Sequence, residues 1–157
     1  MQSCIMKDMS DDPKKIHTAS DFNLDILSGD TDLFRWFLLC YLFGKPIQSA
    51  RAVSTWRLLL EKSLDTPWAI AGLSEYTIDH TLQQGGYSRY QHVTAHGLRV
   101  CMNQLINSYE GSLSQMLQNS QDQDEFTKRL QQLYGVGPKI TEIFMTSVDE
   151  FFARRTD

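Results

Sequence analysis

The sequence predicts an all-α domain of eight or nine short helices, and three observations carry the prediction. Apolar residues recur every three or four positions along most of the chain, which is the spacing of one helix face. No run of Val, Ile and Thr alternates with polar residues for long enough to form a strand. Capping and breaking residues divide the pattern into short segments. With 157 residues, the chain is long enough for one domain with its own core.

The first three helices are expected over residues 20–29, 30–43 and 46–60. Gly44 follows the apolar run of the second helix and should stop it, because glycine readily adopts the backbone that closes a helix. Pro46 would occupy the first turn of the third helix, where its missing N–H is not needed.

The next helices begin at capping signals. Thr66 precedes Pro67, and Ser74 precedes a segment whose apolar residues stand four apart. The glycine pair in "QQGGY" ends that segment, and a long helix is expected over residues 88–109. A turn or two of helix follows in "SLSQML", and the last two helices flank a hairpin near the end of the chain.

That hairpin lies in "LQQLYGVGPKITEIFM", from Leu130 to Met145. Gly135 follows the last periodic residue of its helix, where a left-handed residue closes a helix at low cost. Gly137 has no side chain to hold a ligand away. The amides around Val136, Gly137 and Lys139 are therefore expected to point outward at the positive end of the last helix, where they suit a phosphate oxygen. A plain turn between two helices is the alternative.

The net charge of −4 is unevenly distributed. Residues 1–32 hold seven acidic and three basic side chains, and the remaining 125 hold twelve of each. We therefore expect an acidic N-terminal segment, residues 1–29, ahead of a neutral domain, residues 30–157. The segment could cover a basic surface, bind a protein partner or mediate self-association. Most nucleic-acid binders are more basic than this chain.

Cellular setting and cofactors are also constrained. The most apolar run, Leu33–Gly44, is about half as long as a membrane span and is interrupted by an arginine, so no membrane contact is predicted. The N-terminus lacks the apolar region of a secretory signal. Three cysteines, Cys4, Cys40 and Cys101, stand far apart, which favours reduced thiols in the cytoplasm and excludes a four-cysteine iron–sulfur cluster.

The hairpin "LQQLYGVGPKITEIF" resembles the helix-hairpin-helix of the endonuclease III-like DNA glycosylases, the HhH-GPD superfamily. Upstream, "FRWFLLCYLFGKPIQSARAVSTWRLLLE" is similar to the buried helix, loop and next helix of that family. "DTPWAIAGLSEYTIDHTLQQGGYSRYQHVTAHGLRV" is similar to its Thr-Pro-capped helix, short helix, turn and long helix. The resemblance covers roughly residues 30–150. It implies a compact helix-hairpin-helix glycosylase-like domain that lacks the C-terminal helices and iron–sulfur loop of larger members.

The resemblance implies DNA binding and a role in base-excision repair. Members grip one strand through the hairpin amides, often with a monovalent cation, and flip the target base into a cleft. Gly135, Val136, Gly137 and Lys139 match the gripping segment. Lys139 also matches the lysine that acts as the nucleophile in lyase-type members. Lys45 lies in the loop that, in the family, inserts a side chain beside the flipped base, although a solvated loop lysine is the plainer interpretation.

The aspartate that helps to expel the base in the family has no clear match. Asp157 stands at the family's distance but ends the chain, and Asp149 comes too early. Two functions therefore stay open. The chain is a DNA glycosylase or abasic-site lyase, or it is a catalytically inactive relative that binds DNA or a protein.

Two further groups of residues are candidates for binding. Arg89 lies between two tyrosines in "GYSRYQH", where an arginine can contact phosphate and stack on bases, or simply remain exposed. His92 and His96 stand four apart on the long helix and could share a metal ion. Because no third ligand has a spacing that completes a site, no metal is predicted.

Overall fold

The computed structural model describes residues 17–155, with side chains described through residue 153. Eight α-helices follow two 3-10 turns, and no strand occurs in this part of the chain, so the all-α prediction is confirmed. The elements are η1 (Ala19–Phe22), η2 (Ile26–Ser28), α2 (Asp30–Leu42), α3 (Ser49–Glu61), α4 (Pro67–Ala71), α5 (Glu75–Gly85), α6 (Gln91–Tyr109), α7 (Leu113–Asn119), α8 (Gln123–Gln131) and α9 (Pro138–Arg155).

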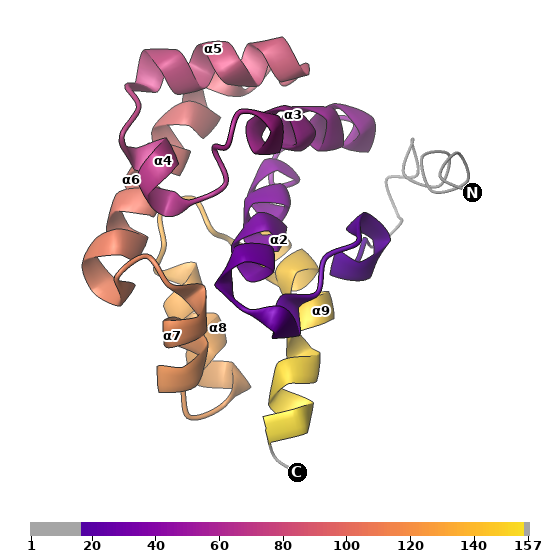
Figure 1. Ribbon diagram of the computed structural model, residues 1–157, viewed down its shortest axis with the longest axis vertical. Coiled ribbons are helices and arrows are strands. Elements are labelled where there is room, and N and C mark those ends of the chain that lie inside the picture. The colour runs from indigo at the N-terminus through magenta and orange to yellow at the C-terminus, as the bar shows by residue number, and fades with distance from the viewer. Residues whose placement is uncertain (1–16, 156–157) are drawn as a thin grey trace.

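Helix α2 forms the centre of the molecule. Every side chain from Trp36 to Phe43 is buried, on all sides of the helix. A helix that is apolar all round must be covered all round, and α2 contacts η2, α3, α7 and α9. Figure 1 shows α2 in the middle, with α3 and α5 toward one end of the molecule and α7, α8 and α9 toward the other.

Buried aromatic rings tie the surrounding elements together. Each ring packs its apolar body in the core and donates its single polar hydrogen to a backbone carbonyl, so that no buried donor is lost. The bonds run from Trp36 Nε1 to Phe144 (3.1 Å), from Trp56 Nε1 to Arg35 (2.9 Å) and from the Tyr87 hydroxyl to Leu42 (2.9 Å).

The predicted helix starts are confirmed where a side-chain cap was evident. The Thr66 hydroxyl accepts the Ala69 amide (3.1 Å) with Pro67 at the first position of α4, and the Ser74 hydroxyl accepts the Thr77 amide (3.1 Å) at the start of α5. These caps act within a few residues, which is why they can be recognised locally.

Three predicted boundaries are wrong. Helix α3 begins at Ser49, because Pro46 lies in a tight turn closed by a bond from the Ile47 amide to the Lys45 carbonyl (2.8 Å). Helix α6 begins at Gln91 instead of residue 88. The helix expected over residues 20–29 is two 3-10 turns, because Asn23 adopts the left-handed conformation (φ 60°) and stops the first.

The described part of the acidic N-terminal segment packs on the core. Ala19 and Phe22 are buried, and the Ala19 amide donates to the Ser147 hydroxyl on α9 (2.8 Å). Residues 17–29 therefore share the core of the helices that follow. Residues 1–16, which carry the rest of that segment, lie outside the described residues.

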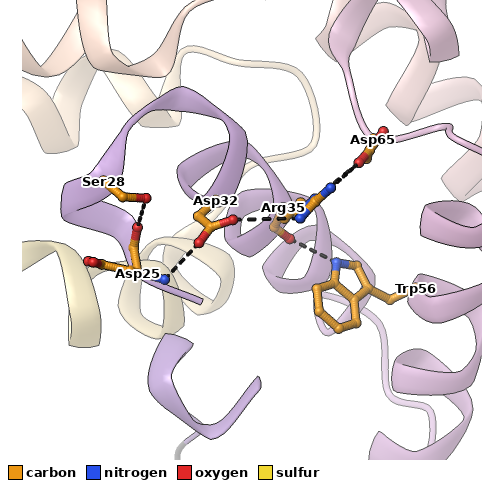
Figure 2. A network of polar contacts seen from close by, with 6 residues as sticks. All are labelled: Asp25, Ser28, Asp32, Arg35, Trp56 and Asp65. Atoms are coloured by element: carbon orange, nitrogen blue, oxygen red, sulfur yellow. Dashed lines mark hydrogen bonds and ion pairs between the residues drawn. The ribbon is translucent and has the colours of Figure 1, made fainter. Parts of the chain in front are cut away.

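A polar network holds the N-terminal turns, α2 and the loop before α4 together (Figure 2). Arg35 on α2 donates from Nε and Nη2 to one oxygen of Asp65 (3.0 and 2.9 Å), and Asp32 lies 3.6 Å from its Nη1. Asp32 also accepts the Asp25 amide (2.9 Å). Because its donors are directed to carboxylates, Arg35 has a structural role and is not available to a phosphate.

The fold bears on two expectations, which concern a membrane span and the cysteine thiols. None of the helices in the described region has the length and hydropathy needed to cross a bilayer. Cys40 and Cys101 are buried free thiols, and burial raises the pKa of each. Neither thiol is therefore available as a nucleophile or a metal ligand. Cys4 lies outside the described residues.

Candidate functional site

The turn between α8 and α9, residues 132–137, has the glycine geometry that the sequence predicts at its first glycine. Gly135 is left-handed, with φ of 79°. A side chain there would also collide with Tyr41, whose ring carbon Cζ lies 3.0 Å from where a Cβ would stand. Conformation and space therefore both require glycine at this position.

The second glycine is different. A Cβ added at Gly137 would meet nothing within 4 Å, and its φ lies outside the left-handed region. Its carbonyl accepts both the amide (3.1 Å) and the hydroxyl (2.8 Å) of Thr141 in the first turn of α9. Gly137 thus leaves bare backbone facing open space without being needed for the turn itself.

Part of the hairpin has the free amides that the sequence predicts. In the described part of the chain, the amides of Gly135, Gly137 and Lys139 donate to no protein group. The prediction is wrong for Val136, whose amide donates to the Leu133 carbonyl (3.1 Å) and whose side chain is buried. Val136 anchors the turn in the core, and its neighbours present the free donors.

Tyr134, which precedes Gly135, makes hydrogen bonds through both its amide and its carbonyl. The Tyr134 amide donates to Gln104 Oε1 (2.6 Å), and its carbonyl accepts the Tyr41 hydroxyl (3.0 Å). Burial raises the pKa of Tyr41, with smaller contributions in the same direction from neighbouring ionisable groups led by Cys101, so Tyr41 stays a donor. Helix α6 can approach Tyr41 closely because Gly97 has no side chain. A Cβ there would lie 2.5 Å from the Tyr41 hydroxyl.

A cavity of about 230 Å³ opens beside Tyr41 and Tyr134, which both line it. Its walls come from the end of α2 and the following turn, from the first half of α6, and from the hairpin and α9: Tyr41, Gly44, Lys45, Val93, Thr94, Gly97, Tyr134, Gly135 and Ile140. The Thr94 hydroxyl is buried and has no hydrogen-bond partner of ordinary geometry among the described residues. Tyr134 is 44% exposed.

The cavity lies where three stretches without acidic residues meet. Residues 33–60, 80–109 and 126–141 contain no Asp or Glu, and they carry four, two and three Lys or Arg respectively. Every residue that lines the cavity belongs to one of these stretches. The chain is acidic overall, but the walls of this cavity carry no negative side chain and suit a negatively charged ligand.

The predicted site residues are only partly brought together. Lys45 and Gly135 line the same cavity. Lys139 is exposed at the start of α9 and is not among the lining residues. Arg89 is exposed just ahead of α6, with its guanidinium carbon 5.8 Å from the centroid of the Tyr90 ring.

No carboxylate faces the cavity from the described residues. Asp149 is exposed on α9, about 15 Å along the helix axis from Lys139 by the rise of an α-helix. Asp157 lies outside the described residues. The general acid or base that base excision needs is therefore not present among the lining residues.

Nothing in the sequence singles out three residues of this site, namely Tyr41, Thr94 and Gln104. Each has the pattern of an ordinary helix residue, because its role depends on a partner far away in the chain. A local signal exists only for Tyr134, a large aromatic between a helix end and a left-handed glycine.

No protein-family model, curated protein or solved structure matches this chain.

Proposed function

We propose that the protein is a DNA-binding member of the helix-hairpin-helix glycosylase class and grips a DNA strand at the α8–α9 hairpin. One observation carries the proposal. The free amides of Gly135, Gly137 and Lys139 lie at the positive end of α9, next to a cavity whose lining contains no acid. Backbone amides at a helix start suit a phosphate, and uncharged or basic walls do not repel the neighbouring phosphates of the same strand.

DNA affinity is expected to fall steeply with salt. A few phosphate contacts imply a slope on the order of −2 to −4 in a plot of log affinity against log salt. Fluorescence anisotropy with a labelled duplex at several salt concentrations measures the slope. The same titration with a Lys45→Gln, Lys139→Gln chain should give a shallower slope. Binding without salt dependence, or no binding at low salt, would favour the plain-turn interpretation and a protein partner.

The geometry favours binding over base excision. Lys139 is exposed and precedes Ile140, which lines the cavity, but the lining supplies no carboxylate to help a base leave. DNA that already carries an abasic site needs no base to be expelled. Its sugar aldehyde can react with the Lys139 amine, forming a C=N bond with loss of water.

Borohydride treatment of protein mixed with abasic DNA is therefore expected to trap a weak covalent adduct, because the hydride reduces the imine. Excision of an intact damaged base is expected to be absent or very slow. An adduct that persists in Lys139→Ala would remove this lysine from the mechanism. Clear DNA binding with no adduct would assign the protein to the catalytically inactive relatives, and efficient excision would show that Asp149 or Asp157 acts after all.

A further inference from the structure

Two histidine–carboxylate pairs join α5 and α6 on the outside of the molecule. His92 and His96 stand one turn apart on α6, and Asp79 and Glu75 stand one turn apart on α5. His92 Nδ1 contacts Asp79 Oδ2, and His96 Nδ1 lies 2.8 Å from Glu75 Oε2. The two helices run antiparallel here, so both imidazoles meet their carboxylates through the same ring nitrogen.

This pairing decides which nitrogen each histidine leaves free. An ionised carboxylate can only accept, so Nδ1 must carry the hydrogen in both rings. In a neutral imidazole the other nitrogen, Nε2, then has a free lone pair. The side chains of His92 and His96 are 81% and 45% exposed, so that lone pair can be reached from solvent.

The same arrangement is typical of histidines that ligate metals. A ligating imidazole usually donates its other N–H to a carboxylate, which sets the tautomer and makes the free nitrogen a better ligand. Histidines four residues apart lie on one helix face and can share an ion. The carboxylates on α5 act as hydrogen-bond partners of the two imidazoles and not as ligands, so water fills the positions that a third protein ligand would take.

We propose that the Nε2 atoms of His92 and His96 chelate one divalent transition-metal ion, with water in its remaining positions. Imidazole ligands suit Zn²⁺, Cu²⁺ and Ni²⁺ better than Mg²⁺ or Ca²⁺. In the described part of the chain, no group of three or more His, Cys, Asp or Glu side chains is arranged to hold a metal. The site is therefore an open one with two protein ligands, which differs from a closed structural zinc site.

The site adjoins the hairpin but does not depend on DNA binding. The His96 ring lies edge-on to the ring of Tyr134, with 5.5 Å between centroids and 85° between planes. A bound ion would place positive charge on the α5–α6 face next to the cavity. Metal binding is measured on the protein alone, so its failure would leave the proposed function untouched, and the reverse also holds.

The test is calorimetric titration of zinc chloride into the full chain carrying Cys4→Ser, which removes the one cysteine outside the described residues. We expect one zinc per chain. Asp79→Asn and Glu75→Gln should each weaken binding about 10- to 100-fold, the usual effect of losing a carboxylate behind a ligating histidine. His92→Ala and His96→Ala should weaken it at least as much.

His80→Ala is the matched control. His80 is exposed on α5 and stacks on Tyr76, with 6.3 Å between ring centroids, and it belongs to neither pair. Its replacement should leave zinc affinity unchanged. Zinc binding that survives both His92→Ala and His96→Ala would overturn the proposal, as would the absence of binding at about 1 mM zinc.

The tautomers give a second readout that needs no substitution. Nitrogen NMR of the metal-free chain should show hydrogen on Nδ1 in His92 and His96, and zinc should shift the Nε2 resonances of these two rings. A neutral ring with its hydrogen on Nε2 and none on Nδ1, in either histidine, would contradict the arrangement on which the proposal rests.

Discussion

Replacing Gly137 with valine should abolish DNA binding and leave the fold intact, whereas valine at Gly135 should destabilise the protein itself. The two glycines are separated by one residue, so this pair of variants distinguishes a contact with DNA from a requirement of the turn. At Gly137 a new side chain meets open space, and the backbone is not left-handed. Its bulk would stand over the free amides and keep a phosphate away.

At Gly135 two costs combine. A β-branched residue in the left-handed conformation costs roughly 1–2 kcal/mol. The collision with Tyr41 forces a shift in packed structure, which typically costs about 1–3 kcal/mol more. The free energy of unfolding should therefore fall by roughly 2–5 kcal/mol in Gly135→Val and by less than about 0.5 kcal/mol in Gly137→Val.

Urea unfolding measures stability, and anisotropy with a labelled duplex at low salt measures binding, for both variants. Gly137→Ala is the matched control, because its small side chain should weaken binding less than valine does. Wild-type affinity in a folded Gly137→Val chain would show that the hairpin does not contact DNA. Equal loss of stability in both valine variants would show that the space seen at Gly137 is not available to a side chain.

Trp36→Ala should be the most damaging single change in the core. Trp36 is 0% exposed, and its ring nitrogen bonds to the carbonyl of Phe144 on α9. Removing a buried aromatic side chain typically costs about 3–5 kcal/mol, a large share of the roughly 5–15 kcal/mol that keeps a domain folded. Trp36→Phe keeps most of the apolar body and loses the hydrogen bond, so it should cost about 1–3 kcal/mol.

The comparison is made by urea unfolding followed by circular dichroism, with Tyr76→Ala as a surface control. Tyr76 is 80% exposed, so its removal should change stability by about 0.5 kcal/mol or less. If Trp36→Ala cost no more than Trp36→Phe, the loss would come from the hydrogen bond to Phe144 and not from the buried ring. A loss similar to that of Tyr76→Ala would contradict the central position of α2.

Where a feature depends on neighbours in the chain, the sequence was a good guide. Thr66 and Ser74 cap their helices as expected, since a cap is a bond between residues three apart. Gly135 is left-handed as expected, because a helix end demands it. Pro46 misled the prediction, because a proline suits both a first helical turn and the tight turn that it occupies.

Where a feature depends on distant neighbours, only the tertiary structure could decide it. The sequence by itself determined the all-α class, the apolar α2 and the glycine hairpin. It did not show that the Tyr41 hydroxyl donates to the Tyr134 carbonyl, or that stretches without acidic residues line one cavity. Nor did it show that His92 and His96 contact carboxylates on α5. The physical reason is that helix periodicity and caps are set over one or two turns, whereas side chains from separate helices meet only through packing.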